Sequence, residues 1–437
     1  MNEKNQGVAL GSLTGQIARA RSQAMLIGCW AAVLCLFFIP INKPLTNLCM
    51  AIALLGTVVG PDFLKRLRKA ASHPVALGAM LWWAVLALSA MYAPQSTALW
   101  RSWFGLLAFS YPLLVLSLIG HDERWRVRAW WSFGAAMGLV VLISWGQFAG
   151  LIPQRALSDG SGIMRNVVFK DYTQQGLATL CLASLLFAVV VWRRTEATSK
   201  YIWMGIVCCL LSVLFVIESR TAWLSTIPLI FLWCTLVFFK GSWGKKLAWV
   251  MLLTICLGAG LAWWQADQNQ SRLTQIGQEI QANVEQKQVT SSGIRLELWR
   301  QSLQLIKQAP IFGHGFDQWH PQFIAQTRDI PAYEPYRMRF PHQEFLLIMV
   351  EQGLLGFVFY CVMLCALALY IRGLALPHRH FYAAFLLLYL TAGAANSLLA
   401  DFSHRHLLLV WLGFMPWVSK LNDAQGERSE LEAGRSA

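Results

Sequence analysis

Apolar runs of about twenty residues recur along most of the chain and are separated by short polar or basic stretches. Runs of this length match the hydrocarbon thickness of a bilayer. They predict twelve membrane-spanning helices, at 24–41, 45–61, 75–92, 99–119, 129–151, 176–192, 201–217, 221–239, 247–264, 343–371, 381–399 and 407–421. Helices are expected because a backbone in lipid must satisfy its own hydrogen bonds, and the runs lack the alternation of barrel strands.

The fold class expected is therefore an all-α polytopic membrane protein with one large, partly helical loop between the ninth and tenth helices. The chain divides into a transmembrane region of about nine helices at 1–264, a periplasmic loop domain at 265–341, three transmembrane helices at 342–421 and a polar cytoplasmic tail at 422–437. The composition agrees, because 437 residues that are 56% hydrophobic and 13% charged hold more apolar surface than a soluble domain can bury.

Orientation follows from the short loops. Under the twelve-helix count their basic residues fall on one side, which the positive-inside rule makes cytoplasmic. These residues are Arg19, Arg21, Lys65, Arg66, Arg68, Lys69, Arg124 to Arg128, Arg193, Arg194, Lys200, Lys240, Lys245, Lys246, Arg372 and Arg379. The long loop then faces outward, into the periplasm if the membrane is the inner membrane of a Gram-negative cell.

The net charge of +14 is only partly explained by those loops. Other cations lie on the outward side, among them Arg155, Arg165, Lys170, Arg220, Arg337, Arg339 and Arg405. Each of them alone can be explained as a side chain that reaches the lipid headgroups. Together they indicate an anionic ligand at the outer face of the membrane, and no nucleic-acid partner is expected.

A helix is well marked inside the long loop. Ser291 can cap it, Leu296, Trp299, Leu303 and Ile306 form one apolar face, and Pro310 ends it. Arg295 lies one turn from Trp299, either stacked on the indole as a structural pair or with its guanidinium free for a phosphate. The Gly313-His314-Gly315 segment that follows is typical of a turn and is not a dinucleotide fingerprint, although His314 can point at a substrate.

Neither a metal nor a cofactor is expected. The outward loops contain no Asp-x-Asp, no His-x-x-x-His and no acidic cluster, which are the usual ligand patterns for divalent cations. All ten cysteines fall in predicted helices, so the outer loop must fold without a disulfide.

Four motifs on the outward side occur in a characteristic order. They are Glu218-Ser-Arg-Thr-Ala-Trp223, Gly293-Ile-Arg-Leu-Glu-Leu-Trp299, Pro310-Ile-Phe-Gly-His-Gly-Phe316, and Pro341-His-Gln-Glu-Phe-Leu346 followed by Glu351-Gln-Gly353. With these motifs, the twelve helices and the late outer loop, the chain resembles the bacterial O-antigen ligase and polymerase family, and within it the ligases, which join O-polysaccharide to the lipid A core. The family often has Asn after the histidine, where this chain has Gln343.

The resemblance implies that the essential arginines and histidine of the family correspond to Arg220, Arg295 and His342. The chemistry of these residues agrees with that role. Guanidinium groups bind phosphate oxygens through paired hydrogen bonds and stay protonated, so Arg220 and Arg295 suit a leaving diphosphate. His342 precedes a helix and lies near Arg337 and Arg339, which favours neutral imidazole, the form that accepts a proton. The alternative is a histidine that anchors the chain at the headgroups.

The resemblance and the chemistry of these residues together predict a metal-independent, inverting glycosyltransferase. Its donor is O-antigen on undecaprenyl diphosphate, its acceptor is lipid A core, and Arg165, Arg339, Arg337, His314 and Trp299 are candidate substrate-binding residues. The polymerase and protein O-oligosaccharyltransferase remain alternatives, the latter weakened by the 17 residues that follow Lys420. A secondary transporter of an anionic lipid or sugar is a third alternative, weakened because no paired broken helices or inverted hydropathy repeat is evident and the charge gathers at one face. The oligomeric state is not predicted.

Overall fold

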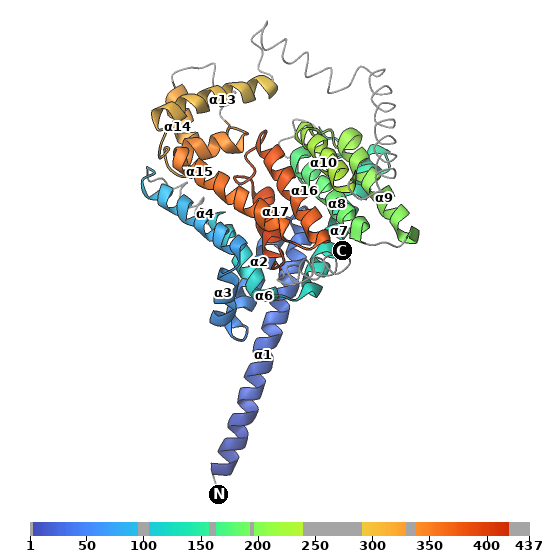
Figure 1. Ribbon diagram of the computed structural model, residues 1–437, viewed down its shortest axis with the longest axis vertical. Helices are drawn as coiled ribbons and strands as arrows, with labels where there is room; N and C mark the ends of the chain where they lie inside the picture. The colour runs from blue at the N-terminus through green and yellow to red at the C-terminus, as the bar shows by residue number, and fades with distance from the viewer. Residues whose placement is uncertain are drawn as a thin grey trace, which may run out of the picture.

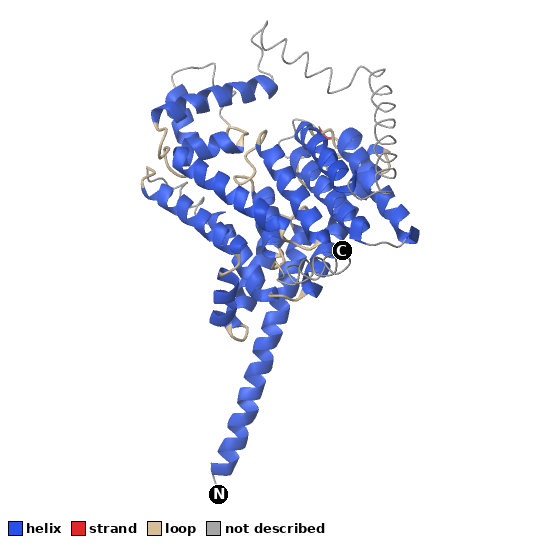
Figure 2. Ribbon diagram, in the orientation of Figure 1, coloured by secondary structure: helices blue, strands red, loops and turns tan. Residues whose placement is uncertain are grey.

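The computed structural model describes residues 3–94, 105–156, 163–192, 196–238, 291–328 and 338–418. Within these ranges the protein is almost wholly helical (Figure 2). The expected helix at 247–264 and the loop residues 265–290 and 329–337 lie outside them, so the boundaries of the predicted loop domain remain a prediction.

The helices of the first half follow the apolar runs of the sequence. They are α1 (Glu3–Phe38), α2 (Lys43–Val59), α3 (Phe63–Ala71), α4 (Pro74–Met91), the 3-10 turn η1 (Leu107–Ser110), α6 (Tyr111–Ile119) and α7 (Glu123–Phe148). Side-chain caps mark three of the starts, because Asn42 accepts from the Leu45 N–H, His73 from the Val75 N–H and Asp122 from the Arg124 N–H.

The second half begins with the short antiparallel strands β1 (Arg155–Ala156) and β2 (Ile163–Met164). The elements that follow are α8 (Tyr172–Trp192), α9 (Glu196–Leu211), the π-helical segment η2 (Ser212–Val216), α10 (Arg220–Phe238), α13 (Ser291–Gln308), α14 (Trp319–Thr327), α15 (Glu344–Arg372), α16 (Leu376–Gly393) and α17 (Phe402–Gly413).

Six helices of the described chain are long and apolar enough to cross a membrane, namely Thr14–Phe38, Pro74–Met91, Glu123–Phe148, Tyr172–Val191, Ser199–Val216 and Glu344–Arg372. A seventh is added if α2 and α3, which meet at 115°, count as one span. Large apolar side chains such as Leu142, Ile227 and Phe231 are about seven-tenths exposed, as expected for residues that face lipid. The protein is therefore an all-α polytopic membrane protein, with fewer spans established by length than the twelve expected.

The helices pack around a continuous apolar core. Helix α1 lies along α2 and α7, and α8 lies against α9, α10 and α16. Helices α13 and α14 lie at one end of the molecule and the basic helix α3 lies at the opposite end (Figure 1). The elements of the outer loop and the most basic of the short helices are thus on opposite sides of the bundle.

Helices α13 and α14 form a small cap with a core of its own. Leu298, Leu305, Trp319 and Phe323 are buried and pack onto Val350 of α15. The Trp319 indole N–H donates to the Ser302 hydroxyl over 2.9 Å, and the Trp319 ring stacks on the Phe323 ring. The cap is thereby fixed to the first turns of α15.

The prediction of which residues form the buried face of α13 is partly wrong. Leu296 and Leu303 are more than half exposed, whereas Ser302 and Gln301 are buried beside Leu298 and Leu305. The hydroxyl of Ser302 donates to the Leu298 carbonyl while it accepts from Trp319, so a polar residue lies on the buried face with its hydrogen bonds made. Periodicity of apolar residues alone cannot identify such a face.

Helix α15 is broken, contrary to the continuous helix expected at 343–371. Gly353 has φ 64° and ψ −165°, and the segment Pro310–Gly315 fills the break. The His314 and Gly315 N–H groups donate to the Val350 and Glu351 carbonyls, and the Leu354 and Leu355 N–H groups donate to the Pro310 and Ile311 carbonyls. One broken helix does not make the pair of broken helices typical of a transporter, and here protein backbone fills the gap that a transporter uses for an ion or substrate.

Glycine is required on both sides of this junction. Gly313 also has a positive φ, and a Cβ on it would lie 2.5 Å from the Glu351 carbonyl. A Cβ on Gly353 would lie 2.3 Å from the Ile311 carbonyl oxygen. The two glycine motifs noted in the sequence thus allow two backbones to meet.

Candidate active site

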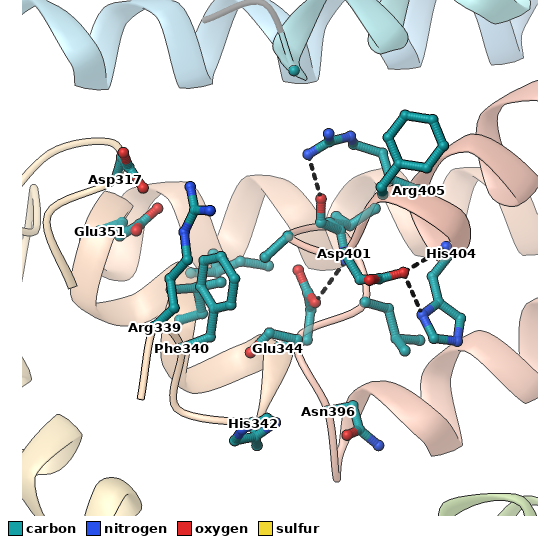
Figure 3. A pocket seen from close by; sticks show the side chains of 18 of the residues that line it. Asp317, Arg339, Phe340, His342, Glu344, Glu351, Asn396, Asp401, His404 and Arg405 are labelled. Carbon is teal, nitrogen blue, oxygen red and sulfur yellow. Dashed lines mark hydrogen bonds and ion pairs between the residues drawn. The ribbon is translucent and has the colours of Figure 1, made fainter. Parts of the chain in front are cut away.

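A polar pocket of about 590 Å³ lies beneath the α13–α14 cap. Its lining comes from segments far apart in the sequence, including the starts of α2 and α8, helix α13, the first half of α15 and the connection from α16 to α17 (Figure 3). The charged residues and histidines of the lining are Lys43, Asp171, Arg295, Asp317, Arg339, His342, Glu344, Glu351, Asp401, His404 and Arg405. The pocket is therefore built almost entirely by long-range contacts.

Arg295 projects from the first turns of α13 into this pocket. Burial lowers its pKa from the ordinary value, and the nearby charge of Arg220 lowers it further. Arginine side chains in general keep their positive charge in proteins. Two like charges held close together in a partly buried place repel each other, and a bound anion relieves that repulsion.

Arg220 begins α10, and the Ser219 hydroxyl accepts from the Ala222 N–H at this helix start. That N–H is therefore already used at the helix start and is not free to bind a phosphate. The start of α10 is tied to the pocket through Thr221, whose hydroxyl accepts from the Asn396 amide over 2.7 Å. Asn396 itself lines the pocket.

His342 lies directly before α15, on the lining of the same pocket. It has φ 54°, a left-handed conformation that is uncommon for residues other than glycine and is enriched at functional sites. The Trp299 indole N–H of α13 donates to the Pro341 carbonyl over 3.0 Å, and the Gln343 side chain accepts from the Leu346 N–H. Contacts on both sides thus hold His342 in place.

The environment of His342 favours the neutral imidazole. Burial lowers its pKa below the ordinary value, and the charge of Arg295 lowers it further. A neutral imidazole accepts a proton from a hydroxyl, and the neighbouring guanidinium groups stabilise negative charge. The arrangement can therefore activate a hydroxyl beside a bound anion.

The other residues singled out in the sequence are divided between the pocket and its surroundings. Arg339 lines the pocket, whereas Trp299 supports the loop that carries His342. His314 lies outside the lining, and its ring Nε2 is 2.9 Å from the Leu305 carbonyl oxygen. Arg165 also lies outside the lining, near the start of α8, where its backbone N–H donates to the Tyr172 hydroxyl. Arg337 lies outside the described residues.

Sequence reasoning missed the far wall of the pocket. Glu344 accepts from the Leu399 N–H over 3.0 Å, and Asp401 accepts from the Gln174 amide and from the Nδ1 of His404. The pKa of Asp401 is lowered to about 2, because the hydrogen bonds and charge of His404 outweigh the opposing effect of burial. The Asp401-Phe-Ser-His404-Arg405 run, a cluster of ionisable residues after an apolar helix, is the feature of the sequence that could have indicated this wall.

The described part of the chain contains no group of three or more His, Cys, Asp or Glu side chains arranged to hold a metal ion. The lining instead carries the cations Lys43, Arg295, Arg339 and Arg405, together with carboxylates such as Glu344 and Asp401 that accept hydrogen bonds.

The protein is thus a polytopic helical membrane protein with a pocket that Arg295 and His342 line together. Arg220 is not part of the lining but lies close enough for its charge to act on Arg295. Residues 205–361 match the protein-family model described as O-antigen ligase, and this match supports membership of the O-antigen ligase family. The matched range runs from α9 into α15 and includes Arg220, Arg295 and His342. No curated protein matches the chain. The family indicates a membrane glycosyltransferase of the O-antigen ligase or polymerase type, which belongs to lipopolysaccharide biosynthesis.

Proposed function

We propose that the protein transfers O-antigen polysaccharide from undecaprenyl diphosphate to a sugar hydroxyl of lipid A core at the periplasmic face of the inner membrane. The main observation that supports this proposal is that Arg295 and His342 line one pocket and interact electrostatically, with Arg220 close to Arg295. A base for the acceptor and a cationic site for the leaving group are thus adjacent.

The reaction needs no further energy source, because a glycan on a diphosphate already has a good leaving group. The acceptor hydroxyl gives its proton to the neutral His342 imidazole as its oxygen forms a bond to the anomeric carbon of the donor. The bond from that carbon to the diphosphate breaks, and the electron pair leaves with the diphosphate, where Arg220 and Arg295 stabilise the added charge. In-line displacement inverts the anomeric centre.

The proposed membrane side is supported by the arrangement of the helices. Helices α13 and α14 lie at the end opposite the basic helix α3 (Figure 1), and Arg295 of α13 lines the pocket. Because cytoplasmic loops carry the excess of lysine and arginine, the α3 end is assigned to the cytoplasm and the pocket to the periplasm.

The test is a transfer assay with purified protein in lipid nanodiscs and no membrane gradient. One lipid diphosphate-linked glycan is offered to lipid A core, to a second lipid-linked repeat and to an acceptor protein. Exclusive or preferred transfer to lipid A core supports the ligase. Transfer to the lipid-linked repeat alone makes the protein a polymerase, and transfer to protein alone makes it an O-oligosaccharyltransferase. Absence of all transfer, with uptake of the lipid in a gradient, makes it a transporter.

A further inference from the structure

A second set of cations lies across the pocket from His342. Figure 3 shows the guanidinium groups of Arg339 and Arg405 at one edge of the pocket and His342 at the opposite edge, with Glu344 between them. We propose that Arg405 and Arg339, assisted by Lys43, form a second phosphate-binding subsite, separate from the Arg220 and Arg295 site. The proposal rests on the proposed function only for the identity of the two lipid substrates.

Arg405 is anchored by a backbone hydrogen bond and makes no direct ion pair with a described carboxylate, although the charges of Asp401 and Glu344 act on it from a distance. Its Nη1 donates to the Leu399 carbonyl over 3.0 Å, which fixes the direction of the guanidinium. Its Nε is buried and makes no hydrogen bond to any described residue. A buried donor without a partner is costly, and a ligand acceptor placed there removes that cost.

Arg339 lies close enough to Arg405 for their charges to repel. Its guanidinium lies over the Phe340 ring, 5.3 Å from the ring centroid, and the side chain remains exposed. Lys43 begins α2 on the same lining, with Nζ 5.6 Å from the Phe402 ring centroid. Three cations from three separate segments thus line the same pocket.

The carboxylates of the pocket do not pair directly with the guanidinium groups of Arg339 and Arg405. Asp401 is engaged by His404 and Gln174, and Glu344 is engaged by the Leu399 N–H. No described carboxylate lies within 4.0 Å of the guanidinium groups of Arg339 or Arg405. Two neighbouring guanidinium groups without a close carboxylate suit the oxygens of a phosphate, which accept paired hydrogen bonds in the plane of each fork.

Two substrates can supply that phosphate. One source is the phosphate substituents on the inner sugars of the acceptor, and the other is the phosphate of the donor that is attached to the polyprenyl chain. The first would make Arg339 and Arg405 determinants of acceptor recognition. The second would extend the donor site across the pocket.

The binding test does not depend on transfer. Inorganic pyrophosphate is titrated onto the full-length protein in nanodiscs, in a background in which Arg220→Gln and Arg295→Gln remove the first site. Residual binding should weaken about tenfold on adding Arg339→Gln or Arg405→Gln, and less on adding Lys43→Gln. Arg372→Gln, at the far end of α15, is the matched control. Binding that is absent from the background protein, or equal in the Arg339→Gln and Arg372→Gln proteins, overturns the proposal.

The kinetic test identifies the source. With the first site intact, Arg339→Gln is assayed with lipid A core before and after enzymatic dephosphorylation of the core. A rise of about tenfold in the acceptor KM that disappears with dephosphorylated acceptor assigns the subsite to the acceptor. A rise in the donor KM with both acceptors assigns it to the donor. If the Arg405→Gln protein does not fold, the measurements on Arg339→Gln decide the test, because Arg339 is exposed. A failure of all transfer by the unmodified protein rejects the proposed function and leaves the pyrophosphate result standing.

Discussion

The Trp299 indole N–H donates to the Pro341 carbonyl over 3.0 Å, so the helix that carries Arg295 also holds the residue before His342. The proposed leaving-group site and the proposed base are thereby joined by one hydrogen bond across 42 positions of the sequence. A change in the position of α13 moves both groups together, which keeps their relative geometry constant.

Replacing Trp299 with Phe tests this link. Phenylalanine keeps an aromatic ring but cannot donate the hydrogen bond, so His342 is expected to lose part of its fixed position. We expect kcat to fall by about five- to tenfold with a smaller change in either KM, measured by glycan transfer. Trp131→Phe, at an exposed position on α7, is the control. Equal kcat values for the two variants would show that the bond has no positioning role.

Replacing Arg220 or Arg295 with Lys tests the diphosphate site. Lysine keeps the charge but loses the paired donors of the guanidinium, so transfer should fall by about 100-fold while the protein still inserts and folds. Arg300→Lys is the control, because Arg300 lies on the same helix and pairs with Glu297 on its exposed side. Near-normal turnover in both site variants would remove these arginines from the reaction.

Replacing His342 with Ala tests the base. Transfer is expected to fall by about 10³-fold, whereas donor binding, measured by displacement of a labelled lipid diphosphate, should change little. His314→Ala is expected to be milder, because the His314 ring contacts the Leu305 carbonyl and does not line the pocket. An inactive His314→Ala protein beside an active His342→Ala protein would move the base to the glycine turn.

The pH dependence of transfer follows from the lowered pKa of His342. The base is neutral above its pKa, so activity should persist as the pH falls below about 6.5 and decline only at the lower pKa of the buried imidazole. Arg295→Gln removes one of the two causes of the shift and should move the acid limb of the residual activity to higher pH. An acid limb that stays in place, or moves to lower pH, would show that ionisation of His342 does not set the acid limb of the pH–activity profile.

Metal independence is expected because Arg220 and Arg295 supply the positive charge that a divalent ion provides in many transferases. Transfer measured with an excess of chelator should stay within about twofold of the untreated rate. Loss of transfer that one particular divalent ion restores would contradict this expectation.

Several features of the fold could be predicted because they follow from local sequence. The apolar runs at 75–92 and 129–151 correspond to α4 and α7, and the start and end of α13 follow from Ser291 and Pro310. The break in α15 could not be predicted, because a single glycine in an apolar run is compatible with a straight helix. Only the arrival of Pro310–Gly315 from the outer loop makes Gly353 a junction.

The site was predictable where a motif placed charge beside a helix end. Arg295 and His342 belong to such motifs, and the structure places both on one pocket. Glu344, Asp401 and Arg405 could not be assigned, since their roles depend on the approach of α15 to the connection between α16 and α17. Trp299 was expected near a ligand or against Arg295, and its bond to Pro341 depends on a contact between two distant segments.

The junction between Pro310–Gly315 and the broken α15 also limits how substrates can enter. Lifting the α13–α14 cap away from the bundle would separate four main-chain hydrogen bonds, each with a net value of about 0.5–1.5 kcal/mol, and would leave their buried groups without partners. The cap is therefore expected to stay in place through each catalytic cycle. Two lipid-anchored substrates then have to arrive sideways, by diffusion in the plane of the bilayer.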